Sequence, residues 1–209
     1  MKLSFTRAAL AAVITLAAAV ACSDYSATPT STYGSSVDST ATATTSSYLR
    51  AASKGPRVGF GFNGTASGFP QGSVFLTGGG SYDPATASNV VDDSTTDVHS
   101  GGGFSCVDAV GQGPLLNCGK DEGVRWDTAQ LLASAPFKCT LTDAVQTAVT
   151  GPDRVVLKAD FYRAGDGIDE SFTAQMIVSE TDLAPNIPGN QTLWIQGVGC
   201  AEATVNFNR

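Results

Sequence analysis

Two segments near the C-terminal end alternate strictly between apolar and polar side chains. In residues 154–163 the apolar positions are Val155, Leu157, Ala159 and Phe161. In residues 171–180 they are Phe172, Ala174, Met176 and Val178. A two-residue period places alternate side chains on opposite faces of a strand, and one buried face is typical of an antiparallel sheet. Residues 164–170 between them, AGDGIDE, predict a hairpin loop.

Shorter segments continue this pattern through the folded region. Leu193 and Ile195 are apolar and share one parity, and the odd positions of residues 201–207 are also apolar. The GVG segment at 197–199 predicts a turn or bulge between these two segments. Gly, Pro, Asp and Asn separate further apolar segments at residues 58–62, 74–76, 103–107, 124–126 and 137–141. Only residues 128–134 predict a helical turn or two. The whole pattern predicts an all-β fold, as an antiparallel β-sandwich or β-barrel.

The N-terminal residues have the composition of an export signal. Lys2 and Arg7 precede a run of Ala, Leu, Val and Ile at residues 8–21 that only Thr15 interrupts. A short positive region followed by an apolar run with small residues at its end is typical of a secretory signal peptide. The run is shorter than the roughly 20 apolar residues that a membrane-spanning helix requires. We therefore expect residues 1–21 to be a signal peptide.

A Ser/Thr-rich segment follows the apolar run. Residues 23–48 contain 15 serines and threonines and no apolar periodicity. Such a segment cannot bury enough apolar surface to offset the entropy of ordering it, so residues 22–50 predict a disordered linker. The composition changes after this linker, and residues 51–209 have the length of one all-β domain.

The charge of the chain excludes some classes of partner. The chain has 12 Lys and Arg against 19 Asp and Glu, a formal charge of −7. Cleavage after Ala21 would remove Lys2 and Arg7 and no acid, so ten basic residues would remain and the charge would be −9. Nucleic-acid binding depends on cationic neutralisation of phosphate, and the acidic balance argues against it. The same balance argues against electrostatic docking on anionic lipid.

The chain has five cysteines, an odd number: Cys22, Cys106, Cys118, Cys139 and Cys200. An odd cysteine in an exported protein requires a separate role, and Cys22 is set apart by its position after the apolar run. The other four predict two disulfides. They contain no C-x-x-C pair and the chain has one histidine, which argues against a zinc site. Of the three possible pairings we favour Cys106–Cys118 with Cys139–Cys200, because the first pair brackets a Gly/Pro loop.

Residues 19–22, AVAC, resemble the lipobox of bacterial lipoproteins, in which small residues precede an acylated cysteine. This resemblance implies that Cys22 carries fatty acids such as palmitate and becomes the mature N-terminus, anchored in a membrane. In lipoproteins of two-membrane bacteria, a serine after the cysteine, here Ser23, is typical of export to the outer membrane or cell surface. Ordinary signal cleavage before Cys22 is the alternative and would give a secreted soluble protein.

Few residues suggest a ligand site. Trp126 and Trp194 would be possible ligand contacts if they were exposed, because indole faces stack on sugar rings; burial in the core is the alternative. Asp166, Asp169 and Glu170 are weak candidates for calcium, since their spacing matches no defined calcium loop and Gly/Asp hairpins are ordinary turns.

Other patterns argue for ordinary structural roles. His99 follows several carboxylates, but no nucleophile motif accompanies it, which predicts a polar surface residue. The glycine triplets at residues 78–80 and 101–103 lack the Lys-Ser/Thr ending of a phosphate-binding loop. They predict a close approach of backbones or a curved sheet instead.

The sequence therefore predicts a non-catalytic, lipid-anchored domain of the cell envelope that binds or scaffolds an envelope protein or a carbohydrate, without a cofactor. One alternative is a carrier that holds a small apolar ligand inside a barrel, although the many phenylalanines argue for a filled interior. A less favoured alternative is an exported hydrolase that uses a carboxylate pair such as Asp160 or Asp166 with Glu170. From Phe104 onward the chain also resembles exported bacterial proteins of uncharacterised function, which implies no activity.

Overall fold

A computed structural model describes residues 55–162 and 171–209 of the chain. All of these residues belong to one unit, Leu49–Arg209. Their secondary structure is almost entirely β, and the exception is a single 3-10 turn, η1 (Pro84–Thr86). Within these ranges, no helix has the length and apolar character needed to cross a membrane. The strands are β1 (Val58–Gly68), β2 (Ser73–Tyr82), β3 (Val98–Asp108), β4 (Arg125–Leu131), β5 (Ser134–Phe137), β6 (Gln146–Val149), β7 (Arg154–Tyr162), β8 (Ser171–Ser179), β9 (Leu193–Ile195), β10 (Gly199–Ala201) and β11 (Thr204–Asn208).

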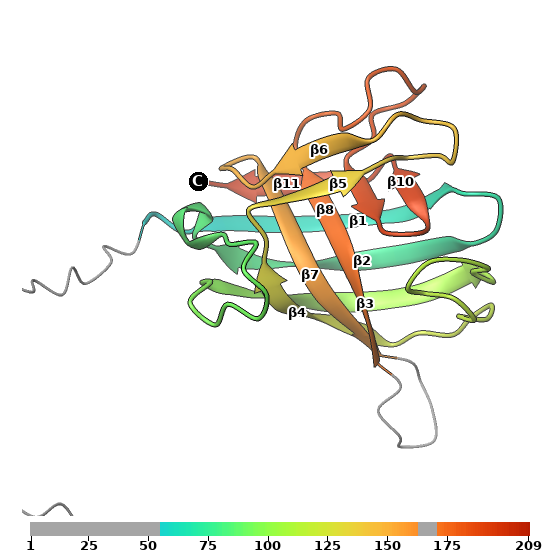
Figure 1. Cartoon of the computed structure of the whole chain (residues 1–209), viewed down its shortest axis with the longest axis horizontal. Helices are drawn as coiled ribbons and strands as arrows, with labels where there is room; N and C mark the ends of the chain where they lie inside the picture. The colour runs from blue at the N-terminus through green and yellow to red at the C-terminus, as the bar shows by residue number, and fades with distance from the viewer. Residues whose placement is uncertain (1–54, 163–170) are drawn as a thin grey trace, which may run out of the picture. The chain divides into compact units, whose positions relative to one another are not determined.

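The main sheet closes on itself into an antiparallel barrel. Its strands lie in the order β10-β9-β8-β7-β4-β3-β2-β1-β11, and β10 pairs with β1 as well as with β9. Eight strands therefore form the closed barrel, and β11 continues along β1 beyond β10 (Figure 1). The predicted all-β fold is confirmed, and of the two predicted architectures the structure has the barrel.

The two alternating segments form neighbouring strands, as predicted. β7 and β8 pair antiparallel from Arg154 opposite Ser179 to Tyr162 opposite Ser171. Their predicted apolar faces point into the barrel and belong to its core. The hairpin loop predicted at residues 164–170 lies outside the described residues.

Residues 128–134 do not form the predicted helical turn. Most of this segment belongs to β4, which pairs with β7, and the register shifts between Thr128 and Gln130. The bulge adds one residue and reverses the alternation, so that Trp126 and Leu131 both enter the core although their parities differ. The helical prediction was wrong because this bulge hides the two-residue period.

Aromatic rings fill the interior of the barrel. Phe104 meets Phe161 edge-on with ring centroids 5.1 Å apart, and Phe62 lies 5.8 Å from the fully buried Trp126. Tyr82 is also fully buried, and its hydroxyl donates to the carbonyl oxygens of Gly151 at 2.7 Å and Arg154 at 3.2 Å. Burial raises the pKa of the Tyr82 hydroxyl well above its ordinary value.

The glycine triplets allow β2, β3 and Trp126 to pack closely. Gly78 lies opposite Gly102 in the β2–β3 pair. A Cβ atom at Gly78 would lie 2.5 Å from Cζ2 of Trp126, and one at Gly102 would lie 2.8 Å from its Nε1. The indole N–H donates to the carbonyl oxygen of Thr77 at 3.1 Å. The predicted close approach of backbones is confirmed.

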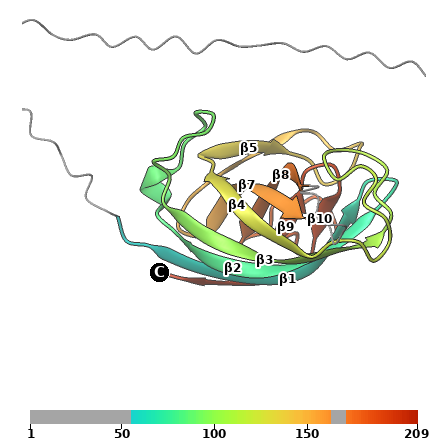
Figure 2. The ribbon, with the colours of Figure 1, turned by 90° about the horizontal axis from the view of Figure 1, so that it is seen from below.

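A second, smaller core lies on the outer face of the barrel. The β5–β6 hairpin packs across the outward side chains of β7, β8 and β9, including Val156, Ile177 and Trp194. Figure 1 shows the hairpin crossing β7 and β8, and Figure 2 shows β5 on the opposite side of the barrel from β1, β2 and β3. β7, β8 and β9 are therefore buried on both faces over part of their length.

Both disulfides have the predicted pairing. Cys106 in β3 is bonded to Cys118, 12 residues later, with Cα atoms 6.2 Å apart. Cys139, which follows β5, is bonded to Cys200 in β10, 61 residues later, with Cα atoms 4.8 Å apart. The second disulfide holds the hairpin against the strand that closes the barrel.

Replacing Gly102 by Ala should lower the free energy of unfolding by about 2–3 kcal/mol, because its Cβ would lie 2.0 Å from the carbonyl oxygen of Thr77. Gly103→Ala is the matched control, since the nearest atom to its Cβ is 3.5 Å away. Urea denaturation should show a change within about 0.5 kcal/mol for this control. Equal effects of the two substitutions would contradict the packing described here.

Replacing Cys139 and Cys200 together by Ser should cost about 4 kcal/mol of unfolding free energy, because the bond closes a 61-residue separation in the unfolded chain. The Cys106–Cys118 bond closes a separation of only 12 residues, so replacing both of these cysteines by Ser should lower the free energy of unfolding by about 3 kcal/mol. Denaturant titrations of the two double variants measure the difference. A reversed order would show that loop closure does not dominate their contribution.

Candidate functional site

Both tryptophans are buried, so of the two predicted alternatives the structure has burial in the core, and neither ring presents an exposed face to a ligand. Trp126 is 0% exposed inside the barrel and Trp194 is 4% exposed beneath the hairpin. Their N–H groups are bonded to backbone carbonyls, that of Trp194 to Lys138 at 2.9 Å. A buried indole ring stabilises the folded state most when its N–H has a hydrogen-bond partner. Trp194 can be buried in this way because β9 is covered on both faces. Trp194 also lines a surface hollow.

Several predicted site residues lie outside the described residues: Cys22 and the weak calcium candidates Asp166, Asp169 and Glu170. Within the described ranges, no three or more His, Cys, Asp or Glu side chains are grouped so that they could hold a metal ion. The side chain of His99 is 80% exposed, and its Nε2 lies 3.7 Å from Asp97 Oδ1. Asp97 is also paired with Arg57, which places it in a structural ion pair.

Two adjoining hollows lie along β5 on the outer face of the barrel, and we call them together the β5 groove. The first has a volume of about 340 Å³ and the second about 320 Å³. They share Pro136 and Gln175. The first is also lined by Asn89, Val91, Gln130, Leu132, Ser134 and Lys158. The second is also lined by Phe69, Phe137, Lys138, Val145, Trp194, Gln196 and Gly197.

The floor of the β5 groove is a row of polar side chains on neighbouring strands. Gln130 of β4 lies opposite Lys158 of β7, and Lys158 lies opposite Gln175 of β8. Gln196, which follows β9, is bonded to the backbone of Gln175 in both directions. The side-chain oxygen of Gln196 accepts from the backbone N–H of Gln175 at 3.1 Å, and the backbone N–H of Gln196 donates to the Gln175 carbonyl at 2.9 Å. Strand register therefore brings four polar residues from four segments into one line.

The edge of β5 forms one wall of the groove and is protected from pairing with another strand. Thr150 N–H donates to the Ala133 carbonyl, so the backbone groups of Ser134 and Pro136 point away from β6 by alternation. The Ser134 N–H donates to the side-chain oxygen of Asn89 at 3.2 Å, and Pro136 has no N–H. Proline and side-chain capping are ways to block a free edge. We therefore expect the groove to bind side-on, without adding a strand to β5.

Residues 88–93 form the wall at the first hollow. The buried Gln130 amide donates to the carbonyls of Ser88 at 3.1 Å and Val90 at 2.6 Å. Lys158 Nζ lies 3.1 Å from Asp92 Oδ1. Side-chain hydrogen bonds from Thr95 and Ser88 lower the pKa of the neighbouring Asp93, because they stabilise its ionised carboxylate.

The groove offers unused hydrogen-bonding groups, and of its two lysines Lys158 has its charge compensated by a carboxylate. Among the described residues, no partner bonds the side-chain amide of Gln175 or the NH₂ group of Gln196. None of the described lining residues is acidic. Lys158 is paired with Asp92, and Lys138 Nζ donates to the Leu141 carbonyl at 3.0 Å. The arrangement suits a neutral ligand with donor and acceptor groups next to apolar surface.

Gln130, Gln175 and Gln196 were not predicted from the sequence as candidate site residues. The only signal in the sequence is that each occupies an outward or terminal position of an apolar strand, which many solvated residues do. Their alignment depends on the register of four strands and on the bulge in β4, which no local pattern reveals.

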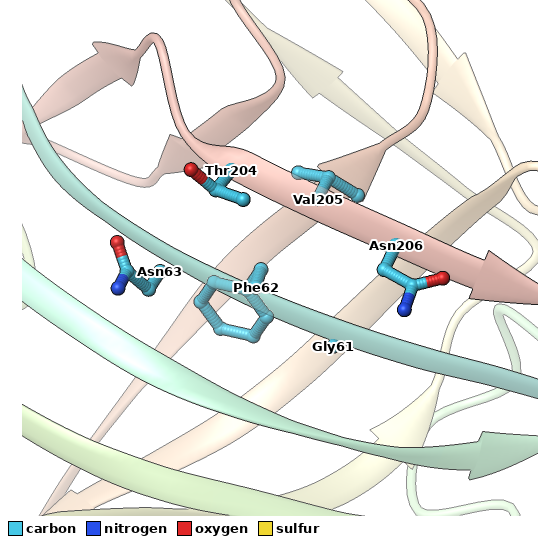
Figure 3. A pocket seen from close by; sticks show the side chains of 6 residues that line it. All are labelled: Gly61, Phe62, Asn63, Thr204, Val205 and Asn206. Atoms are coloured by element: carbon cyan, nitrogen blue, oxygen red, sulfur yellow. The ribbon is translucent and has the colours of Figure 1, made fainter.

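Another hollow, of about 290 Å³, lies where β1 and β11 pair. Figure 3 shows Asn206 beside Gly61, which has no side chain to occupy the position opposite it, and Asn63 beside Thr204 on the other side of Phe62. All of its lining residues come from these two paired strands. Within the part of the chain that the structure describes, no third element provides an opposing wall, so this hollow is a weaker candidate than the β5 groove.

The chain matches no protein-family model, no curated protein and no solved structure. The resemblance of the region after Phe104 to exported bacterial proteins therefore stays a prediction. The candidate site stands on its own geometry.

Proposed function

We propose that this chain is an exported, lipid-anchored domain of the cell envelope that binds an uncharged glycan chain in the β5 groove without catalysing a reaction. The observation that carries the proposal is the side-chain amide of Gln175, which lies at the junction of the two hollows and has no partner among the described residues. An amide side chain offers both donors and an acceptor, which match the hydroxyl groups of a sugar. Phe69, Pro136 and Val145 supply apolar surface beside it for the C–H faces of sugar rings.

Export is supported by the disulfides. Two disulfides are consistent with folding in an oxidising compartment outside the cytoplasm. Lipid attachment at Cys22 and a location at the outer membrane or cell surface rest on the AVAC segment and the linker that follows it. More than one acyl chain would make such an anchor stable.

The two alternative functions gain no support. Phe62, Phe104 and Trp126 fill the barrel interior that a carrier would use for its ligand. For a hydrolase, Asp160 accepts a hydrogen bond from the Thr173 hydroxyl at 2.6 Å. Asp166, the alternative to Asp160, and Glu170, the predicted partner of either, lie outside the described residues.

Binding of neutral oligosaccharides tests the groove. Titration calorimetry with short linear oligomers of glucose and of N-acetylglucosamine should detect binding by the wild-type chain. Gln175→Ala and Gln196→Ala should each weaken it by up to about tenfold, the value of one hydrogen bond. Asn63→Ala removes an exposed amide from β1, across the barrel, and should leave the affinity unchanged. Loss of affinity with Asn63→Ala alone would place the ligand outside the groove.

A panel of uncharged peptides separates the ligand class from the site. If peptides bind in a way that depends on Gln175 and oligosaccharides do not bind, the β5 groove is the binding site but its ligand is not a glycan. Oligosaccharide binding that is unchanged in both glutamine variants would overturn the groove itself.

Metabolic labelling with palmitate tests the anchor. The wild-type chain and a Ser26→Ala control should incorporate the label, and Cys22→Ala should not, because the thiol of Cys22 is the attachment point. Label that remains on Cys22→Ala would contradict the anchor. This result does not affect the interpretation of the oligosaccharide-binding experiment, which tests the β5 groove separately.

A further inference from the structure

The outer edge of β11 exposes backbone groups that have no partner among the described residues. Ala203 N–H donates to the Thr192 hydroxyl at 3.0 Å, and this hydroxyl donates to the Ala203 carbonyl at 2.8 Å. Both groups of Ala203 therefore point away from β1. Since this direction alternates along a strand, the N–H and C=O of Val205 and Phe207 also point away from β1. No described hydrogen bond engages these four groups.

This edge lacks the protection that β5 has. The strand Thr204–Asn208 contains no proline, no charged residue and no bulge against β1. Native proteins usually block a free edge by such devices, because an exposed edge pairs with other strands. Val205 and Phe207 are only partly buried although they pack on the barrel core. A strand added to β11 would cover them.

We propose that β11 pairs antiparallel with β11 of a second copy of this chain, about a two-fold axis at Asn206. In this register Val205 lies opposite Phe207 of the partner, and Phe207 lies opposite Val205 of the partner. Each pair exchanges two hydrogen bonds, so the four free groups of one strand satisfy the four of the other. The same surface serves both copies, as a two-fold dimer requires.

The charge distribution favours a second copy over a charged partner. The mature chain would carry a charge of −9, so two copies repel each other over much of their surface. The outward positions of β1 and β11 near this edge are uncharged: Gly59, Gly61, Asn63, Thr204, Asn206 and Asn208. Figure 3 shows the side chains of Asn63, Thr204 and Asn206 on this part of the two strands. The strand-to-strand contact itself therefore places no charged side chain of β11 against another.

Sedimentation of the full exported chain tests the dimer, with Cys22→Ala in every sample so that lipid adds no association. The wild type should show a concentration-dependent monomer–dimer equilibrium. Val205→Pro removes the Val205 N–H, which makes no hydrogen bond within the barrel. In the dimer each copy donates one such bond to the other, so the substitution removes two of the four hydrogen bonds between the copies. It should raise the dissociation constant by about tenfold or more, equivalent to about 1.4 kcal/mol. Val205→Ala keeps the N–H and is its control.

Asn206→Lys provides a second variant that keeps the backbone intact. The two-fold axis places the two introduced ammonium groups next to each other, so the dissociation constant should again rise by about tenfold or more. Asn63→Lys adds the same charge on the neighbouring strand, away from the axis, and should have a smaller effect.

Hydrogen exchange provides a direct readout of the edge. The amides of Val205 and Phe207 should exchange more slowly as the concentration of the wild-type chain increases. A chain that stays monomeric at every accessible concentration would overturn the proposal. So would a dimer whose dissociation constant is unchanged by both Val205→Pro and Asn206→Lys.

Discussion

The structure depends on the short pairing that closes the barrel. β1 and β10 meet through Ser67 opposite Cys200 and Gly68 opposite Gly199. Both glycines have positive φ, +128° and +118°, which disfavours other residues. A Cβ at Gly68 would lie 2.4 Å from the Cys139 carbonyl, and one at Gly199 would lie 2.6 Å from it. The absence of two side chains thus lets the hairpin approach the closing strands.

The same point determines where the candidate site lies. The Cys139–Cys200 bond holds the end of β5 against β10, and the hairpin then lies across the outer faces of β7, β8 and β9. Where it covers these strands, apolar residues such as Ile177 and Trp194 are buried. Where its edge stops, the polar row through Lys158 and Gln175 remains at the surface. The β5 groove is the boundary between these two regions.

β5 and β11 each have a free edge, and the two edges differ in the backbone groups that they leave available. At β5, Pro136 and the side chain of Asn89 leave few backbone groups available, so that wall is suited to side-chain recognition. At β11 the backbone groups of Val205 and Phe207 have no partner among the described residues, and the strand itself contains no charged residue. The chemistry of each edge leads to the kind of partner inferred for it, a glycan beside β5 and a strand beside β11.

The sequence by itself determined the all-β class and the buried faces of β7 and β8, and it favoured, among three pairings, the disulfides that the structure has. The first two follow from alternation, which is a local property that neighbouring residues display directly. The barrel, the burial of Trp194 and the alignment of Gln130, Gln175 and Gln196 were decided only by the tertiary structure. Each depends on which strands pair and in what register, and the bulge at Ala129 changes that register without a visible signal. Trp194 shows the difference clearly, since its parity indicates the outer face, whereas a hairpin distant in the sequence decides that this face is buried.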